Sequence, residues 1–312
     1  MASIQSYILK FWIRRLDIFG NEPINPQSLR IRLEKTGSRL KPHSQVRIIA
    51  VDAGSIPAEW LIPQGAPRDR AVLYIHGGAW FMGSTKTHRG FVSNLAFTSG
   101  IRALSINYRL APENPFPAGL EDCISVYEWL LHSGFPARHI IVAGDSAGGN
   151  LTLALLIALR DAGKPLPAGA VALSPATDLA LTGESYKTRK RIDPYFRHVG
   201  FNTIIEDYIT GHDPFHPLIS PLYADLNGLP PLLIHVGDHE VLLDDTVRFG
   251  DRAVAAGVRA KTVVWPKMFH VFQMFAPILP EAQQAIDQIA KFILAQQNDE
   301  QNHARNTWYD EC

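Results

Sequence analysis

The chain has 312 residues, a length that suits one large α/β domain with an inserted segment. Hydrophobic residues make up 46% of the chain and charged residues 19%, which argues against disorder and against a fibrous architecture. Lys+Arg and Asp+Glu number 30 each, so the charge balance gives no sign of nucleic-acid binding and favours a neutral or weakly polar small-molecule ligand.

The first segment carries apolar residues at three- and four-residue spacing: Ile4, Tyr7, Ile8, Phe11, Trp12, Leu16 and Phe19. This spacing predicts an amphipathic helix whose apolar stripe packs on the body of the domain. Binding of the stripe to a membrane surface or to a partner is the alternative. Basic residues at 10, 14 and 15 interrupt the segment, so it does not read as a signal peptide, and no later stretch reaches transmembrane length. We therefore expect a cytoplasmic protein without stable membrane insertion.

After Pro42, short apolar runs alternate with stretches of helical pattern. The predicted strands are residues 45–51, 58–63, 71–76, 102–108, 139–144, 170–174, 232–236 and 261–265. The first two are rich in β-branched residues and form an opening pair. The later runs are almost continuously apolar, which is typical of strands buried on both faces of a parallel sheet. The pattern predicts an α/β fold with a mostly parallel sheet flanked by helices.

One interval breaks this rhythm. Between Ser174 and Leu232 lie 57 residues, far more than a crossover helix needs. Its centre combines a basic run at residues 187–191 with several aromatic and aliphatic side chains. We expect the basic run to form a solvated face, and the apolar residues to form part of a lid.

A serine motif follows the predicted strand 139–144. Gly144-Asp145-Ser146-Ala147-Gly148 stands between that strand and an alanine-rich run that predicts a helix. A sharp strand-to-helix turn holds a serine strained at its apex, and flanking glycines let neighbouring segments approach. The start of the helix also offers unpaired N–H groups to a developing anion. The motif in this context indicates a nucleophile elbow with Ser146 as the nucleophile.

A glycine pair follows the predicted strand 71–76, in His76-Gly77-Gly78-Ala79-Trp80. Glycines directly after a strand expose backbone N–H groups, which can bind the oxyanion of a tetrahedral intermediate together with the N–H of Ala147. An ordinary glycine turn is the alternative. Because the pair occurs together with the elbow, the sequence favours an oxyanion hole formed by Gly77, Gly78 and Ala147.

His270 lies five residues beyond the last predicted strand. A histidine in a loop at the carboxyl edge of a sheet can reach a serine on another loop at the same edge. It can then take the proton of that serine and return it to a leaving alcohol. We assign the general base to His270.

The acid that orients this histidine is less specified. Four carboxylates follow the strand 232–236 within eight positions: Asp238, Glu240, Asp244 and Asp245. Only one is needed to fix the imidazole tautomer, and spacing alone does not choose it. Asp244 and Asp245 fall inside the next helical pattern, where we expect capping and local pairing.

Together these motifs resemble the hormone-sensitive-lipase family of bacterial esterases. The matching stretches are HGGAW, YRLAPENPFPAGLEDC (108–123), GDSAGGN, EVLLDD and FHVF, which span about residues 70–275. The resemblance implies an α/β-hydrolase fold with an eight-stranded sheet over the whole chain. It also implies a helical cap contributed by about residues 1–45 and about 178–215. It implies no metal and no cofactor.

The resemblance assigns roles by position. Ser146 matches the nucleophile, Gly77 and Gly78 the oxyanion-hole glycines, and His270 the base. The family's acid motif D-P-L-x-D places its first Asp on Glu240, a departure that keeps the charge; Asp244 is the second choice and Asp238 the third. By the same comparison His76 orients the oxyanion loop, and Asp145 fills a variable position without a catalytic role.

The expected activity is hydrolysis of short-chain acyl esters through an acyl-enzyme, with lactones and aryl or terpenoid esters all compatible. An amidase or peptidase with the same triad is one alternative. A receptor for a small ligand on a catalytically dead scaffold is another, which the presence of His270 with Ser146 disfavours. A homodimer formed through the last strand and helix is implied by the resemblance.

Overall fold

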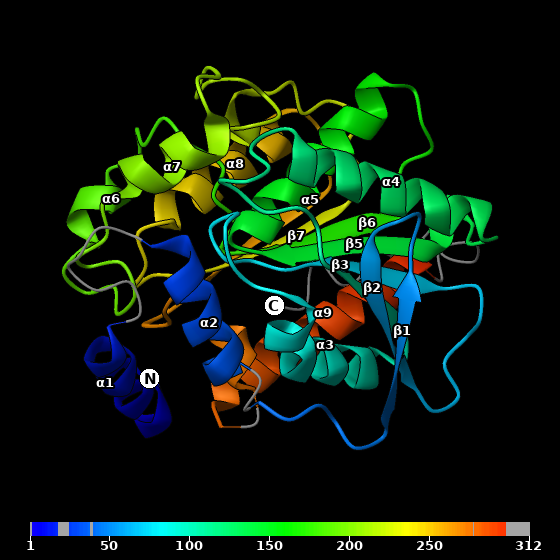
Figure 1. Cartoon of the computed structure of the whole chain (residues 1–312), viewed down its shortest axis with the longest axis horizontal. Helices are drawn as coiled ribbons and strands as arrows, with labels where there is room; N and C mark the ends of the chain where they lie inside the picture. Colours follow the sequence, from blue (N-terminus) through cyan, green and yellow to red (C-terminus); the bar gives the residue numbers. More distant parts are fainter. Residues whose placement is uncertain (1, 18–24, 38–39, 277, 298–312) are drawn as a thin grey trace.

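The computed structural model describes residues 2–17, 25–37, 40–276 and 278–297. Eight strands form one central sheet in the order β1-β2-β4-β3-β5-β6-β7-β8, with helices on both of its faces (Figure 1). The strands are β1 (Val46–Asp52), β2 (Pro57–Pro63), β3 (Ala71–Ile75), β4 (Arg102–Ile106), β5 (Ile140–Asp145), β6 (Gly169–Leu173), β7 (Leu232–Gly237) and β8 (Ala260–Trp265).

The sheet is parallel except at one edge. β1 pairs with β2 and β2 with β4 in antiparallel fashion, whereas all neighbours from β4 across to β8 are parallel. Every residue of β3, β5, β6 and β7 is buried, as a sheet covered on both faces requires. The predicted mostly parallel eight-stranded sheet is confirmed. Because β5, β6 and β7 are parallel neighbours, their carboxyl ends open onto one edge of the sheet.

Two hydrophobic cores lie on opposite faces of the sheet. Along β3, Leu73 and Ile75 belong to one core and Val72 and Tyr74 to the other, as the two-residue period of a strand dictates. Figure 1 shows which helices cover each face. The first core is closed by α4 (Ala118–His132), α5 (Ala147–Asp161) and α8 (Leu243–Ala255), and the second by α3 (Thr85–Ser99) and α9 (Pro280–Gln297).

Four helices lie outside this sandwich: α1 (Ile4–Leu16), α2 (Pro26–Gly37), α6 (Ser185–Thr188) and α7 (Phe201–Ile209). They gather on one side of the molecule, at the left of Figure 1. The N-terminal segment and the β6–β7 segment contact each other directly. Arg14 Nη2 donates to Ile192 O at 2.8 Å, and Arg197 Nη2 donates to Arg14 O at 3.2 Å. A two-part cap requires contacts of this kind.

The N-terminal helix forms as predicted, but the expectation that its apolar stripe packs on the domain body is wrong. About half or more of each stripe side chain is exposed in Ile4, Tyr7, Ile8, Phe11, Trp12 and Leu16, while Phe19 lies outside the described residues. The opposite side of the helix packs on the domain instead, with Ile13 buried in the second core and Leu9 packed against it. Ser6 and Lys10 are buried, and Lys10 Nζ donates to Lys267 O at 3.0 Å. Across the described ranges, no helix combines the length and hydropathy needed to cross a membrane.

Candidate active site

Ser146 occupies the turn between β5 and α5 with φ 53° and ψ −118°, a strained conformation for a residue with a side chain. Glycine is required on both sides of this turn. A Cβ on Gly144 would lie 2.4 Å from Gly148 O, and a Cβ on Gly148 would lie 2.1 Å from Ile75 O. The local structure is therefore the sharp strand-to-helix turn that the sequence predicted.

His270 and Glu240 meet across two loops at the same edge of the sheet. Glu240 is completely buried, and its Oε2 lies 2.8 Å from His270 Nδ1. Its Oε1 accepts the Ser174 hydroxyl at 2.8 Å and the Gly237 N–H at 2.6 Å. Burial opposes a charge on His270, but the hydrogen bond and the negative charge of Glu240 raise its pKa above the ordinary value.

The end of β6 connects this pair to the serine turn. Leu173 O accepts the Ser146 N–H at 2.7 Å, while the adjacent Ser174 donates its hydroxyl to Glu240. The Ser174 oxygen also accepts the N–H of Val271, the residue after His270, at 3.3 Å. One dipeptide thus holds the loops of Ser146, Glu240 and His270 together.

The glycine loop after β3 differs in one respect from the prediction. The N–H of Gly77 donates to Asp145 Oδ1 at 3.0 Å, so it is already satisfied and does not face an oxyanion; this part of the expected oxyanion hole is corrected. Within the described residues, the N–H groups of Gly78, Ala79 and Ala147 have no protein acceptor. Ala79 also lines the pocket beside Ser146. Sequence reasoning missed Ala79 because it followed the glycines rather than the direction of their N–H groups.

Asp145 and His76 shape this loop from behind. Asp145 Oδ1 accepts the Tyr74 hydroxyl at 2.6 Å as well as the Gly77 N–H. The His76 ring stacks on Tyr108 with ring centroids 4.4 Å apart, and burial lowers its pKa to about 3. A neutral imidazole held in this way orients the loop and adds no charge to it, as the sequence led us to expect of His76.

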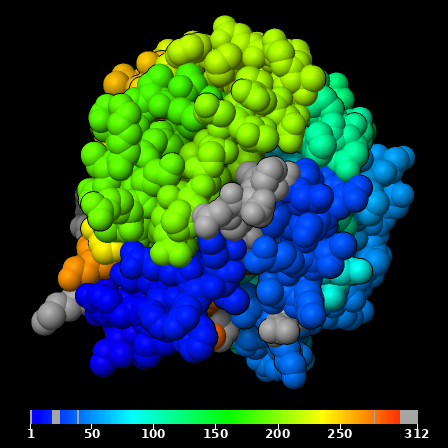
Figure 2. All heavy atoms as spheres, turned by 60° about the vertical axis from the view of Figure 1, so that its left-hand side comes forward, coloured from blue at the N-terminus to red at the C-terminus, as the bar shows by residue number. Residues whose placement is uncertain are grey.

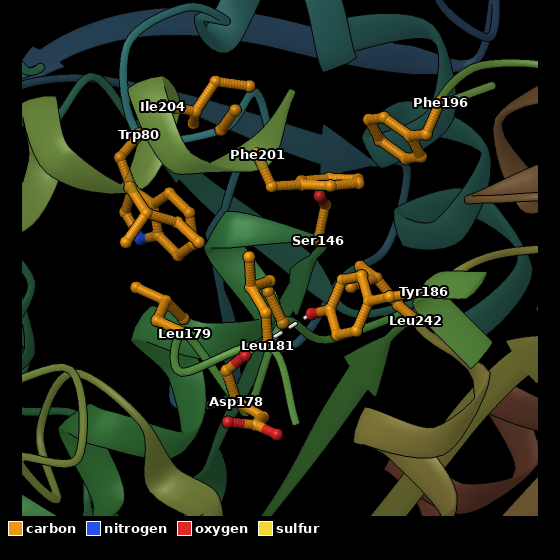
Figure 3. Close-up of a pocket in the computed structure, with 13 residues that line it drawn as sticks. Trp80, Ser146, Asp178, Leu179, Leu181, Tyr186, Phe196, Phe201, Ile204 and Leu242 are labelled. Carbon is orange, nitrogen blue, oxygen red and sulfur yellow. Dashed lines mark hydrogen bonds between the residues drawn. The ribbon is translucent and has the colours of Figure 1, made fainter. Parts of the chain in front are cut away.

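An apolar pocket opens beside Ser146, and most of its lining comes from the β6–β7 segment. In Figure 3 the Ser146 hydroxyl points toward the ring of Phe201, with Trp80 and Ile204 on one side and Phe196 on the other. Phe196 also contacts His270 edge-on, with ring centroids 4.9 Å apart. The pocket wall therefore contacts His270 directly.

Comparison with known proteins shows the family to which this chain belongs. The family described as alpha/beta hydrolase fold matches residues 72–274. An acetyl-hydrolase from Streptomyces hygroscopicus is 45% identical over 244 residues, which cover 78% of this chain and 81% of the relative. A solved esterase from the bacterial hormone-sensitive lipase family is 42% identical, with a TM-score of 0.90 and coverage of 95% of this chain and 99% of that one. The chain belongs to this family.

It is a carboxylesterase of the hormone-sensitive-lipase family and a serine hydrolase, so the family, fold and enzyme class predicted from the sequence are confirmed. It is also similar to the esterase EstE5, at 40% identity and a TM-score of 0.91, covering 95% of this chain and 100% of that one. One EstE5 crystal was soaked with p-nitrophenyl butyrate.

The other carboxylates of the acid loop have different partners in this esterase. Asp238 accepts the N–H of Lys267, and Asp244 accepts the N–H of Ser185 at 2.9 Å. Asp245 accepts the N–H groups of Thr177 and Asp178 at 2.8 and 2.9 Å. The expected capping by Asp244 and Asp245 is replaced by these contacts, since the side chains reach the inserted segment and not the first turn of their own helix.

Asp193 is a residue of the site that sequence reasoning missed. It is completely buried; its Oδ1 accepts the N–H groups of Tyr195 and Phe196, and its Oδ2 accepts the N–H of Val241 at 2.9 Å. Burial raises its pKa to about 6, against the opposing charge of His270. Asp193 thus ties the aromatic wall of the pocket to the loop of Glu240. The Asp-Pro dipeptide before two aromatic residues is a turn signal that could have drawn attention to it.

We expect Asp193→Asn to lower the free energy of unfolding by about 1–3 kcal/mol, because the amide NH₂ would face one of the three N–H donors and leave it unsatisfied. Urea unfolding measures this. Asp213→Asn is the matched control, since Asp213 also accepts a nearby N–H, from Phe215 at 2.9 Å, but is exposed. Equal losses in the two variants would contradict the bridging role of Asp193.

Proposed function

We propose that this carboxylesterase hydrolyses short-chain acyl esters through an acyl-enzyme formed on Ser146, with His270 as general base and Glu240 as its acid partner. The observation that carries this proposal is the buried Glu240–His270 pair. The Leu173-Ser174 dipeptide at the end of β6 is hydrogen-bonded both to this pair and to the strained turn of Ser146. Phe196 lines the pocket that contains Ser146 and also contacts the ring of His270.

In the first half of the reaction, Ser146 Oγ attacks the ester carbonyl while His270 Nε2 takes its proton. Glu240 accepts a hydrogen bond from the Nδ1–H of His270 and stabilises the imidazolium that forms. The developing oxyanion meets the N–H groups of Gly78, Ala79 and Ala147, with Gly77 holding the loop through Asp145. His270 then gives its proton to the leaving alcohol. Water attacks the acyl-enzyme in the same way and releases the acid.

The cap supports a preference for short acyl chains. We assign the cap to about residues 178–215 together with the N-terminal helices; the first of these segments supplies Phe201 and Ile204 over the serine. Bulky side chains that line the pocket beside the nucleophile limit the length of an acyl group. The similarity to EstE5, one crystal of which was soaked with a butyrate ester, agrees with this preference.

The test is hydrolysis of p-nitrophenyl acetate, butyrate, octanoate and laurate. We expect kcat/KM to fall beyond butyrate, and Ser146→Ala to lower kcat by about 10⁶-fold on every ester. Phe201→Ala, which removes a ring from the pocket wall, should raise the ratio of octanoate to butyrate turnover about tenfold. Full activity in Ser146→Ala would refute the nucleophile, and equal rates on butyrate and laurate would refute the chain-length preference.

The cytoplasmic location and the homodimer stay predictions. β8, the strand that the dimer would use, lies at the edge of the sheet and is partly exposed along most of its length.

A further inference from the structure

The outward face of α1 is the largest concentration of exposed apolar side chains in the described part of the chain. Six of the fourteen exposed large hydrophobic residues lie on this single helix, from Ile4 at 76% exposure to Tyr7 at 50%. We call the six the α1 face: Ile4, Tyr7, Ile8, Phe11, Trp12 and Leu16. Figure 2 shows the helix, in dark blue, on the surface of the molecule beside α2 and the β6–β7 segment. Clusters of this kind on a folded protein mark interaction sites.

The α1 face cannot turn inward without breaking specific contacts. The opposite side of the helix is held by Lys10 on Lys267 O and by Arg14 on Ile192 O. At its start, the Ser3 hydroxyl donates to Glu281 Oε2 at 2.8 Å. These polar bonds and the burial of Ile13 in the second core together fix the rotation of the helix about its axis. The exposure of the face is therefore built into the docking of α1.

The charges around the α1 face indicate which kind of partner it can bind. Residues 4–16 contain no carboxylate; their cations are Arg15, which is exposed, Arg14, which is partly buried, and Lys10, which is buried. Helical geometry places Arg15 in the middle of the α1 face, where its guanidinium lies over the Phe11 ring at 5.5 Å. Lys267 is also exposed, with its Nζ 3.4 Å from the Tyr7 hydroxyl. Three carboxylates flank the helix: Asp17 stands at its C-terminal cap, Glu281 accepts from the Ser3 hydroxyl, and Asp238 accepts the Lys267 N–H.

A second copy of the chain does not complement this surface. A two-fold interface would set the α1 face against a copy of itself and bring the exposed cations Arg15 and Lys267 of both copies into the same interface. An anionic lipid surface complements both features, because its headgroups attract the cations and its acyl boundary accepts the apolar side chains. Trp12 and Tyr7 are residue types that favour the interface between lipid and water.

We propose that the α1 face binds the surface of anionic phospholipid membranes. The helix has 13 residues and is about 20 Å long, shorter than the hydrocarbon core of a bilayer, so it lies in the plane of the surface. Since Arg14 and Arg197 join the helix to the β6–β7 segment, a bound helix would hold the cap close to the membrane. No residue of α1 lines the pocket beside Ser146, so binding and catalysis can be measured separately.

The experiment is sedimentation of the full-length protein with vesicles of phosphatidylcholine, with and without 30 mol% phosphatidylglycerol (about a typical anionic content). We expect binding to the anionic vesicles that weakens in 0.5 M NaCl (a Debye length of roughly 4 Å) and a blue shift of tryptophan emission on binding. Ile8→Gln combined with Trp12→Gln should weaken binding at least about tenfold. Arg15→Gln should weaken it about fivefold.

Val254→Gln is the matched control, because Val254 is an exposed apolar residue of α8 with 58% exposure, far from α1 in the sequence. It should bind like the wild type, and all variants should hydrolyse p-nitrophenyl acetate at the wild-type rate. Absence of binding to anionic vesicles would overturn the proposal, as would equal binding to neutral vesicles. A wild-type dimer in light scattering that the Ile8/Trp12 variant converts to a monomer would assign the face to a second copy instead.

Discussion

Glu240→Gln is expected to lower kcat on p-nitrophenyl butyrate by about 10³–10⁴-fold while leaving the fold intact. The reason lies in the two donors on Oε1, the Ser174 hydroxyl and the Gly237 N–H. They will hold the carbonyl oxygen of the glutamine in that position, so its NH₂ group must face His270 Nδ1. That nitrogen then becomes an acceptor, and Nε2 carries the hydrogen. An imidazole in this tautomer cannot take the proton of Ser146.

The pH profile gives an independent readout of the same variant. In the proposed mechanism the neutral form of His270 is the base, and burial lowers its pKa less than the hydrogen bond and charge of Glu240 raise it, so in the wild type the pKa lies above 6.5. Activity therefore falls as the pH drops through a value above 6.5. Glutamine removes the negative charge and lowers this pKa, so the acid limb of the remaining activity should move to lower pH.

Asp244→Asn is the control for this experiment. Asp244 lies in the first turn of α8, and its carboxylate accepts the N–H of Ser185 in α6 but does not bond His270. We expect its kcat to stay within about threefold of the wild type. If Asp244→Asn lost as much activity as Glu240→Gln, or if the acid limb of Glu240→Gln did not move, the acid assignment would fail.

Gly148→Ala should lower the free energy of unfolding by about 3 kcal/mol or more and kcat/KM by at least about 100-fold. The added Cβ would lie 2.1 Å from Ile75 O and 2.5 Å from His76 O, and both are backbone atoms at the end of β3. Either α5 or the end of β3 has to move. Because Ala147 starts α5 and Gly78 follows β3, the N–H groups proposed for the oxyanion would no longer converge.

Urea unfolding and steady-state hydrolysis of p-nitrophenyl butyrate measure these two effects. Gly200→Ala is the matched glycine, since its Cβ would meet no atom within 4 Å and its φ is −88°. It should change the free energy of unfolding by less than about 0.5 kcal/mol. A Gly148→Ala variant with wild-type stability and activity would show that the close approach of α5 to β3 is not required.

The parts of this esterase that could be predicted from sequence are those encoded locally. The buried strands are visible in the sequence as continuous apolar runs. The serine turn is visible because it needs glycines at 144 and 148, which flank the serine in the sequence. His270 could be found because the loop after the last strand must open at the same edge as the loop after β5. Each of these inferences needs only the residues of one segment and the direction of the sheet.

Other features depend on contacts between distant segments and could not be predicted in this way. Among the four carboxylates, Glu240 is the one bonded to His270, and it is held there by Ser174, which lies 66 residues before it. Gly77 loses its expected role because Asp145, from the next strand in the sheet, takes its N–H. The α1 stripe faces outward because Ile13 packs in the second core and Lys10 binds the backbone carbonyl of Lys267, and both partners lie in distant segments.

The position of Ser174 has a consequence for how this enzyme can diversify. The Leu173-Ser174 dipeptide, which bonds the loops of the three side chains proposed to react, ends where the inserted segment begins, at residue 175. Changes of length or sequence beyond that point leave the alignment of nucleophile, base and acid anchored in the sheet. A replacement segment would have to reproduce buried polar connections such as Asp193 on the Val241 N–H and Thr177 on Asp245. New substrate ranges can therefore evolve by replacement of this segment, while the residues proposed to carry out the reaction stay in place.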